Sequence, residues 1–135
     1  MADEWTIRDY TRNFLAKERP VGVLLDEKTV EAQMIAAVRA WAGFAGLACF
    51  DYAQKPAHEI ARDTEITATE WARIRPLFLL YLEREQALQL EASRGMGIDP
   101  YGRSSSEIAA EIQQFEQDLP HQAFCIPVFE VPRAE

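Results

Sequence analysis

The sequence predicts an all-α fold: a small helical bundle of about four helices, followed by an extended C-terminal arm that contains prolines. The chain of 135 residues is long enough to bury about two-thirds of its unfolded surface as one domain. Its content of 48% hydrophobic and 27% charged residues is typical of an ordered globular protein. Apolar residues recur at helical spacing up to residue 119, and prolines interrupt the C-terminal residues after it.

The first predicted helix spans residues 4–17. Ile7, Tyr10 and Phe14 fall on one helical face, and the basic residues fall elsewhere. Pro20 ends this helix, and the apolar connector after it is expected to pack into the core.

The second helix is predicted from Thr29, or from Asp26 if the cap lies earlier, to about Phe50. Its buried stripe is expected to comprise Val30, Met34, Val38, Trp41, Ala45 and Ala48. The neighbouring flank carries small residues, which allow another helix to approach closely: Ala36, Ala40, Gly43 and Gly46. Gly43 and Gly46 each cost around 1 kcal/mol of helix propensity relative to alanine, so packing must compensate for them or the helix must bend.

The third helix has the clearest start. Thr67 and Glu70 form a capping box, while Ile66 and Trp71 occupy the two positions of a hydrophobic staple. One face of this central helix is predicted to carry Trp71, Ile74, Phe78, Tyr81, Leu82, Leu88 and Ala92. Pro76 is expected to kink the helix one turn earlier, because it removes a backbone hydrogen bond.

Several breaks are predicted between the helices. Residues 51–65 should form a loop with one helical turn over 58–62. Gly95 is expected to supply the left-handed C-cap of the third helix. Pro100 and Gly102 then favour a turn, since glycine tolerates positive φ.

The last helix is predicted to begin at a second capping box, formed by Ser104 and Glu107. Its apolar face is expected to carry Ile108, Ile112, Phe115 and Leu119. The short connection predicts that this helix folds back against the third helix. The serines and glycines of this reversal are therefore interpreted as caps and not as an active site.

Residues 1–119 are interpreted as the bundle domain and residues 120–135 as an extended arm. Prolines at 120, 127 and 132 exclude a helix and a central strand there. The predicted partner-binding residues are the apolar residues of this arm: Phe124, Ile126, Val128, Phe129 and Val131. Fully extended, the arm would reach about 50 Å. It either wraps its own domain or docks on a partner chain, and the second is preferred because a small bundle has no need for such a long apolar extension.

No catalytic, cofactor-binding or metal-binding residues are predicted, and the protein is not expected to be an enzyme. His58 and His121 are isolated, and Cys49 and Cys125 are interpreted as inert apolar thiols of a reduced compartment. The triplet at 104–106 has no histidine at useful spacing.

A further group of carboxylates, Glu83, Glu85 and Glu91, lies in the second half of the third helix. Glu83 and Glu85 point to different helix faces, so they cannot act as an acid–base pair on one substrate atom. The three are interpreted as a solvated or intersubunit face.

The formal net charge of −8 argues against broad electrostatic binding to nucleic acid. The charged N-terminal sequence is unlike a signal peptide, so we expect a cytoplasmic product. The apolar window 30–50 is nearly long enough to span a membrane, but Glu31 and Arg39 interrupt it, and no membrane helix is expected.

The stretch TEWARIRPLFLLYLEREQALQLEASRGMGIDPYGRSSSEIAAEIQQFE, together with the arm, resembles the head-to-tail adaptor (head-completion or connector) proteins of tailed bacteriophages. This resemblance implies a virion structural protein at the head–tail junction, made in the host cytoplasm. It implies a homo-oligomeric ring, commonly twelvefold, with a portal protein above and a tail or collar protein below. DNA would pass through the lumen without specific binding, as an acidic subunit favours. In such proteins extended termini often dock on the neighbouring ring, a role that would fall to the apolar residues of the arm.

A different class of function also fits the sequence. A small cytoplasmic regulatory or antitoxin-like helical protein would bind one partner through the arm, or through the small-residue flank of the helix at 29–50. Such a regulator should be a monomer or dimer at all concentrations, whereas an adaptor should assemble with virion proteins.

Overall fold

The computed structural model describes residues 5–19, 25–47, 49, 59–97 and 102–124. Along the chain the elements are β1 (Trp5–Thr6), α1 (Ile7–Asn13), the π-helical η1 (Phe14–Glu18), α2 (Glu27–Ala45), β2 (Glu65–Ile66), α3 (Ala68–Ala92), the 3-10 helix η2 (Ser93–Met96) and α4 (Ser105–Phe124). The predicted all-α bundle is confirmed.

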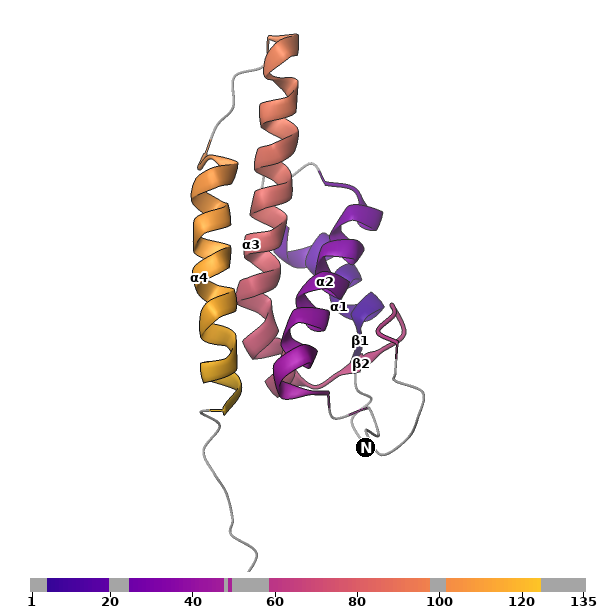
Figure 1. The fold of residues 1–135 in the computed structure, drawn as a ribbon. Coiled ribbons are helices and arrows are strands. Elements are labelled where there is room, and N and C mark those ends of the chain that lie inside the picture. The colour runs from indigo at the N-terminus through magenta and orange to yellow at the C-terminus, as the bar shows by residue number, and fades with distance from the viewer. Residues whose placement is uncertain (1–4, 20–24, 48, 50–58, 98–101, 125–135) are drawn as a thin grey trace, which may run out of the picture.

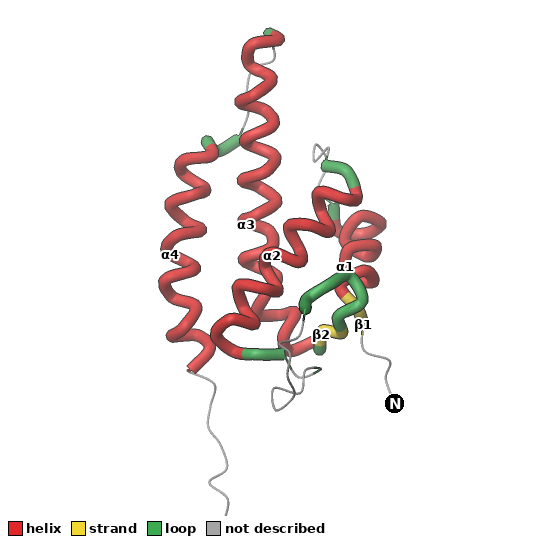
Figure 2. The backbone as a smooth tube through the Cα atoms, turned by 45° about the vertical axis from the view of Figure 1, so that its right-hand side comes forward, coloured by secondary structure: helices red, strands yellow, loops and turns green. Residues whose placement is uncertain are grey.

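The long helix α3 lies at the centre of the bundle and packs against both α2 and α4. The helix α1 packs on α2, so α1 and α4 lie on opposite sides of the molecule (Figure 1). This order is retained when the molecule is turned (Figure 2). The last turns of α3 extend past the start of α4 (Figure 1). The predicted reversal of α4 against α3 is therefore confirmed.

A small strand pair, which the sequence does not predict, joins the N-terminal region to the start of α3. β1 and β2 are antiparallel, with Trp5 opposite Ile66 and Thr6 opposite Glu65. Thr6 also caps α1, because its side chain accepts a hydrogen bond from the backbone of Asp9. The first helix therefore begins at Ile7 and not at residue 4.

The predicted apolar faces meet in one core. Buried residues include Ile7, Tyr10 and Phe14 of α1 and η1, Val30, Met34, Val38 and Trp41 of α2, Ile74, Phe78, Tyr81 and Leu82 of α3, and Ile108, Ile112 and Leu119 of α4. Aromatic contacts connect α1 and η1 to α3. The rings of Tyr10 and Trp71 stack with centroids 4.6 Å apart, and Phe14 meets Phe78 edge-on at 5.2 Å. Such pairs contribute more than their buried area alone.

All three predicted N-terminal helix caps are confirmed by hydrogen bonds. Asp26 accepts from the backbone of Thr29 at 3.2 Å, which selects the earlier of the two predicted starts of α2. The Thr67–Glu70 capping box has both reciprocal bonds, at 3.0 and 3.2 Å. The equivalent bonds between Ser104 and Glu107 are both 3.3 Å long.

Two predicted helix ends are wrong, and glycine geometry explains both. The helix α2 ends at Ala45, not near Phe50, because Gly46 leaves the helical conformation with φ of 71°. After α3, η2 continues through residue 95, and the left-handed residue is Gly97, with φ of 83°. Only a residue without a side chain adopts this conformation at low cost.

The predicted helical turn in the loop after α2 is not present in the part that the structure describes. Residues 59–61 form no helix, and the backbone N–H of Thr64 donates to the carbonyl of Ala61 in a turn. His58 lies outside the described residues. In α3, Pro76 lies within one uninterrupted helix, so the kink stays a prediction.

The prediction that no helix exists beyond residue 119 is wrong for residues 120–124. The helix α4 continues through Pro120 and ends at Phe124. Proline removes one backbone donor, but the buried Leu119 and a hydrogen bond of 3.4 Å from Arg73 to the carbonyl of Gln122 hold this last turn on α3. Residues 125–135 lie outside the described residues, so the extended arm stays a prediction there.

Candidate partner-binding site

The structure places only one of the five predicted partner-binding residues. Phe124 is the last residue of α4, while Ile126, Val128, Phe129 and Val131 lie outside the described residues. The helix α4 ends where α2 ends and α3 begins, at one end of the bundle (Figure 1). The chain therefore leaves the described bundle from a helix end that is tied to α3.

Three large apolar side chains are exposed in the described part of the chain. They are Trp5 at 44%, Phe44 at 46% and Leu88 at 46% of full exposure. Phe44 belongs to the last turn of α2, at the same end of the bundle as the end of α4. Phe44 is not among the partner-binding residues predicted from the sequence. Its exposure could have been predicted, because Phe44 falls outside the buried stripe that contains Trp41. Exposed aromatic residues are enriched in protein interfaces.

The exposed position of Leu88 corrects a prediction. The sequence predicts Leu88 and Ala92 on the buried face of the third helix, but both are exposed. Their helical spacing does match that face. However, α3 here extends beyond the neighbouring helices, so no described element covers these two residues (Figure 1).

Four exposed side chains of α4 are acidic: Glu107, Glu111, Glu116 and Asp118. Residues 105–124 contain no lysine or arginine. By helical spacing Glu107, Glu111 and Asp118 share one side of the helix, and we call these three residues the α4 face. The hydroxyl of Tyr81 donates to Glu116 at 2.6 Å, and burial together with this bond raises the pKa of Tyr81. Tyr81 therefore stays protonated as a donor and adds no charge.

Two of the carboxylates expected on a solvated or intersubunit face instead hold the α3–α4 reversal. The guanidinium of Arg103 bonds both oxygens of Glu83, at 2.8 and 2.7 Å, and also bonds Glu111. Glu91 accepts from the backbone N–H and the hydroxyl of Ser105, at 2.9 and 2.7 Å. These hydrogen bonds lower the pKa of Glu83 and of Glu91. These contacts hold the start of α4 against α3 at the predicted reversal.

An open hollow of about 360 Å³ lies beside the loop that precedes α3. It is lined by Cys49, Glu59, Ala61, Asp63, Thr64 and Glu65. Partial burial and the negative charge of Glu70 raise the pKa of the Cys49 thiol. Cys49 as a whole is exposed. A thiol with a raised pKa is a poor nucleophile at neutral pH. The hollow therefore provides no activated cysteine.

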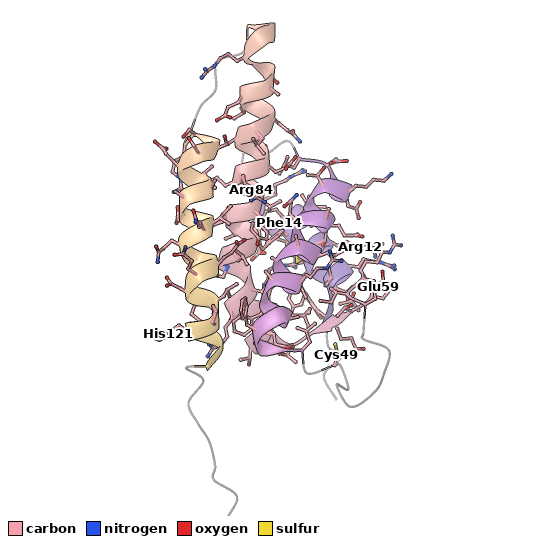
Figure 3. All side chains as sticks on the ribbon, viewed as in Figure 1. Arg12, Phe14, Cys49, Glu59, Arg84 and His121 are labelled. Atoms are coloured by element: carbon pink, nitrogen blue, oxygen red, sulfur yellow. The ribbon has the colours of Figure 1, made fainter. Side chains whose placement is uncertain are left out.

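Metal ligands do not gather in the described residues. No group of three or more His, Cys, Asp or Glu residues there could hold a metal ion. His121 lies on α4, far from Cys49 and Glu59, which lie on the other side of the molecule (Figure 3). This separation agrees with the interpretation of His121 as an isolated residue.

Among the described helices, none is both long enough and apolar enough to cross a membrane. Comparison of the chain with protein-family models, curated proteins and solved structures found no match. Function must therefore be inferred from the surfaces of this chain: an acidic α4 face, exposed apolar side chains, and a helix end that leads into an apolar sequence.

Proposed function

We propose that this chain is a structural protein of a tailed-bacteriophage virion, a head-to-tail adaptor. Copies of it form an oligomeric ring, commonly twelvefold in such proteins, between the portal and a tail or collar protein, and DNA passes through the ring. The observation that carries the proposal is the end of α4. A compact helical bundle there continues into a sequence with five large apolar residues and three prolines between positions 120 and 132.

The apolar residues of the arm are suited to binding a second protein. Burial of each large apolar side chain contributes roughly 1.5–3 kcal/mol, before the cost of ordering the chain is subtracted. Prolines reduce that cost, because they restrict the backbone before binding. The exposed Phe44 lies at the same end of the bundle and enlarges the apolar surface available to a partner.

The charge of the chain supports the passage of DNA without binding. The net charge is −8, and α4 carries four exposed carboxylates. A surface of this sign repels phosphates, so duplex DNA would slide past it and not adhere.

The alternative, a small regulatory or antitoxin-like protein, would use the small-residue flank of α2 or the arm. Ala36 and Ala40 of that flank are half-buried and pack against the core of their own chain. Much of the flank is therefore already used within the bundle. This observation favours the adaptor over the regulator.

The test is a pull-down of the full-length chain and of a chain that ends at Phe124, each against the portal and tail proteins encoded beside it. We expect only the full-length chain to retain a portal or tail protein. The paired substitution Ile126→Ser with Val128→Ser should abolish retention, whereas Glu130→Gln, in the same segment, should preserve it. Retention of one non-virion partner by both chains would refute the adaptor and favour the regulator.

A further inference from the structure

An uncharged apolar surface lies at the end of α2. Residues 40–50 are the longest run of the chain without a polar or charged side chain. Within this run Gly43 and Phe44 are exposed, and the ring of Phe44 is 46% exposed. We call Gly43 and Phe44 the α2 end. It is an apolar surface on which a further segment can pack.

A second apolar run begins where α4 ends. Residues 123–129 also contain no polar or charged side chain. The last turn of α4 is fixed on α3, because Leu119 is buried and the guanidinium of Arg73 donates to the carbonyl of Gln122 at 3.4 Å. The chain therefore enters the arm from a fixed point on the bundle.

The two apolar runs meet at the same end of the molecule. α2 packs directly on α4, and both helices end where α3 begins (Figure 1). Cys49, which follows α2, and His121, in the last turn of α4, both lie at this end (Figure 3). The axes of packed helices are about 8–10 Å apart. Residues 125–131 span about 23 Å when extended, so the arm is long enough to cross from α4 to Phe44.

The alternation of an extended chain divides the apolar residues of the arm into two sets. In an extended segment, side chains two residues apart share a side, and Pro127 restricts the residue before it to extended backbone. Ile126 and Val128 then share one side, while Phe129 and Val131 share the other. One set can pack on the bundle while the other set faces outward.

We propose that residues 125–131 dock on the α2 end of their own chain through Ile126 and Val128, and thereby present Phe129 and Val131 to the partner. The inference deepens the proposed function, on which its second half rests, because it assigns different tasks to the apolar residues of the arm. An arm that is already docked loses less conformational entropy when the partner binds.

The arm of the same chain fits the α2 end better than the arm of a second copy. A segment that is tethered close to its binding site has an effective concentration on the order of millimolar. A second copy competes only at its free concentration, and its binding also costs translational and rotational entropy. Since the arm is longer than the spacing between packed helices, no second copy is needed to cover Phe44.

Cross-linking within the chain measures this docking directly. The chain has two cysteines, of which Cys49 is exposed close after the α2 end. A full-length reporter chain carries Cys125→Ser and Glu130→Cys, so that its two thiols lie beside the α2 end and in the arm. A short thiol-to-thiol cross-linker is added to dilute protein at mildly alkaline pH, because the pKa of Cys49 is raised. The readout is the initial rate at which the monomer becomes cross-linked within one chain.

Substitutions on either side of the contact should slow this reaction. In the reporter chain Phe44→Ser should lower the rate by roughly tenfold, the change expected when one large apolar contact is lost. The pair Ile126→Ser with Val128→Ser should lower it by as much or more. Combining the two sets should add little further loss, because both remove the same contact.

Matched controls separate docking from folding and from partner binding. Leu88 is exposed to the same 46% as Phe44 but lies in the projecting part of α3, so Leu88→Ser should leave the rate unchanged. Phe129→Ser with Val131→Ser should also leave the rate unchanged, but should lower retention of the portal or tail protein. Phe44→Ser should lower both the rate and the retention. Circular dichroism of each variant checks that the bundle is folded.

A cross-linking rate that ignores both Phe44→Ser and the Ile126–Val128 pair would overturn the inference. Cross-links that form only between copies, when isotopically heavy and light chains are mixed, would overturn it as well. Retention that ignores Phe129→Ser with Val131→Ser would overturn the outward task of these two residues.

The two proposals can fail separately. If the rate falls as expected but no chain retains a virion protein, the docked arm stands and the adaptor fails. If a portal or tail protein is retained while the rate is insensitive to every substitution, the adaptor stands and the docked arm fails.

Discussion

The apolar stripe predicted for α3 continues from residues 68–82, which are rich in apolar residues, into residues 83–92, which are more polar, and the two parts are held in different ways. In residues 68–82 most of the apolar side chains are buried, and Phe78 is fully buried. In residues 83–92 only Ala87 is buried and Leu88 is 46% exposed. There Glu83 pairs with Arg103, and Glu91 accepts hydrogen bonds from Ser105, the first residue of α4. A helical stripe therefore becomes core only where a neighbouring element covers it.

This difference has an energetic meaning. Apolar burial contributes about 25 cal/mol per Å² and is insensitive to pH, whereas exposed ion pairs contribute little and weaken with salt and acid. The first part of α3 should therefore determine the global stability of the fold. The second part should determine how firmly the start of α4 is held.

The largest expected effect tests whether residues 68–82 of α3 contribute most to the stability of the fold. Phe78→Ala removes a fully buried ring that contacts Phe14 and Trp71, and should lower the free energy of unfolding by about 3–5 kcal/mol. Leu88→Ala, in the exposed half, should change it by no more than about 0.5 kcal/mol. Urea denaturation measures both. Similar losses for the two variants would contradict the difference between the two halves.

A smaller effect is expected at the glycine that ends the projecting part. Gly97→Ala should cost about 1–2 kcal/mol, because φ is +83° and alanine is strained there, although no atom lies within 4 Å of the added methyl group. Gly43→Ala is the matched control, since Gly43 lies inside α2 with equal free space. It should stabilise the protein by about 0.5–1 kcal/mol. If thermal unfolding shows that Gly97→Ala lowers stability while Gly43→Ala raises it, the backbone conformation at each glycine determines the effect of the added methyl group.

The N-terminal cap of α3 should contribute about 1 kcal/mol. Thr67→Ala removes the side chain that accepts from the backbone N–H of Glu70, and calorimetry should register a loss of this size. Thr67→Ser retains an accepting hydroxyl and serves as the control. An equal loss in both variants would mean that the Thr67 methyl group, and not the cap, supplies the stability.

The smallest expected effects concern the ion pairs of the α3–α4 reversal. The bond from Arg103 lowers the pKa of Glu83 below its ordinary value of 4.5. The stability it contributes is therefore fully present above pH 4.5, and is lost as pH falls through the lowered pKa. Arg103→Gln should reduce stability slightly at neutral pH, less in high salt, and hardly at all in strong acid.

Hydrogen exchange of the first turn of α4 checks this prediction, because Arg103 also bonds Glu111 at that helix. Faster exchange confined to this turn is the expected signature. Arg39→Gln, at an exposed arginine of α2 without an ion pair to a described residue, is the control. Faster exchange throughout the bundle would show that the ion pairs of Arg103 support the whole fold.

Local signals in the sequence determined where most helices begin and which faces are apolar. The caps at Asp26, Thr67 and Ser104 could be predicted because a capping side chain and its backbone partner lie within three residues of each other. The stripes through α1, α2 and α4 could be predicted because helical periodicity is also local. The acidic composition, which argues against broad nucleic-acid binding, can be read without knowing the fold.

Only the tertiary structure decided the rest, because it depends on contacts between residues far apart in sequence. Two contacts of this kind are the pairing of Trp5 with Ile66 and the bridge from Arg103 to Glu83 and Glu111. Leu88 is exposed because it lacks such a contact. Helix α4 likewise passes Pro120, where packing on α3 outweighs the lost backbone donor. The placement of α1 and α4 on opposite sides of the bundle belongs here too, since it results from how the helices pack.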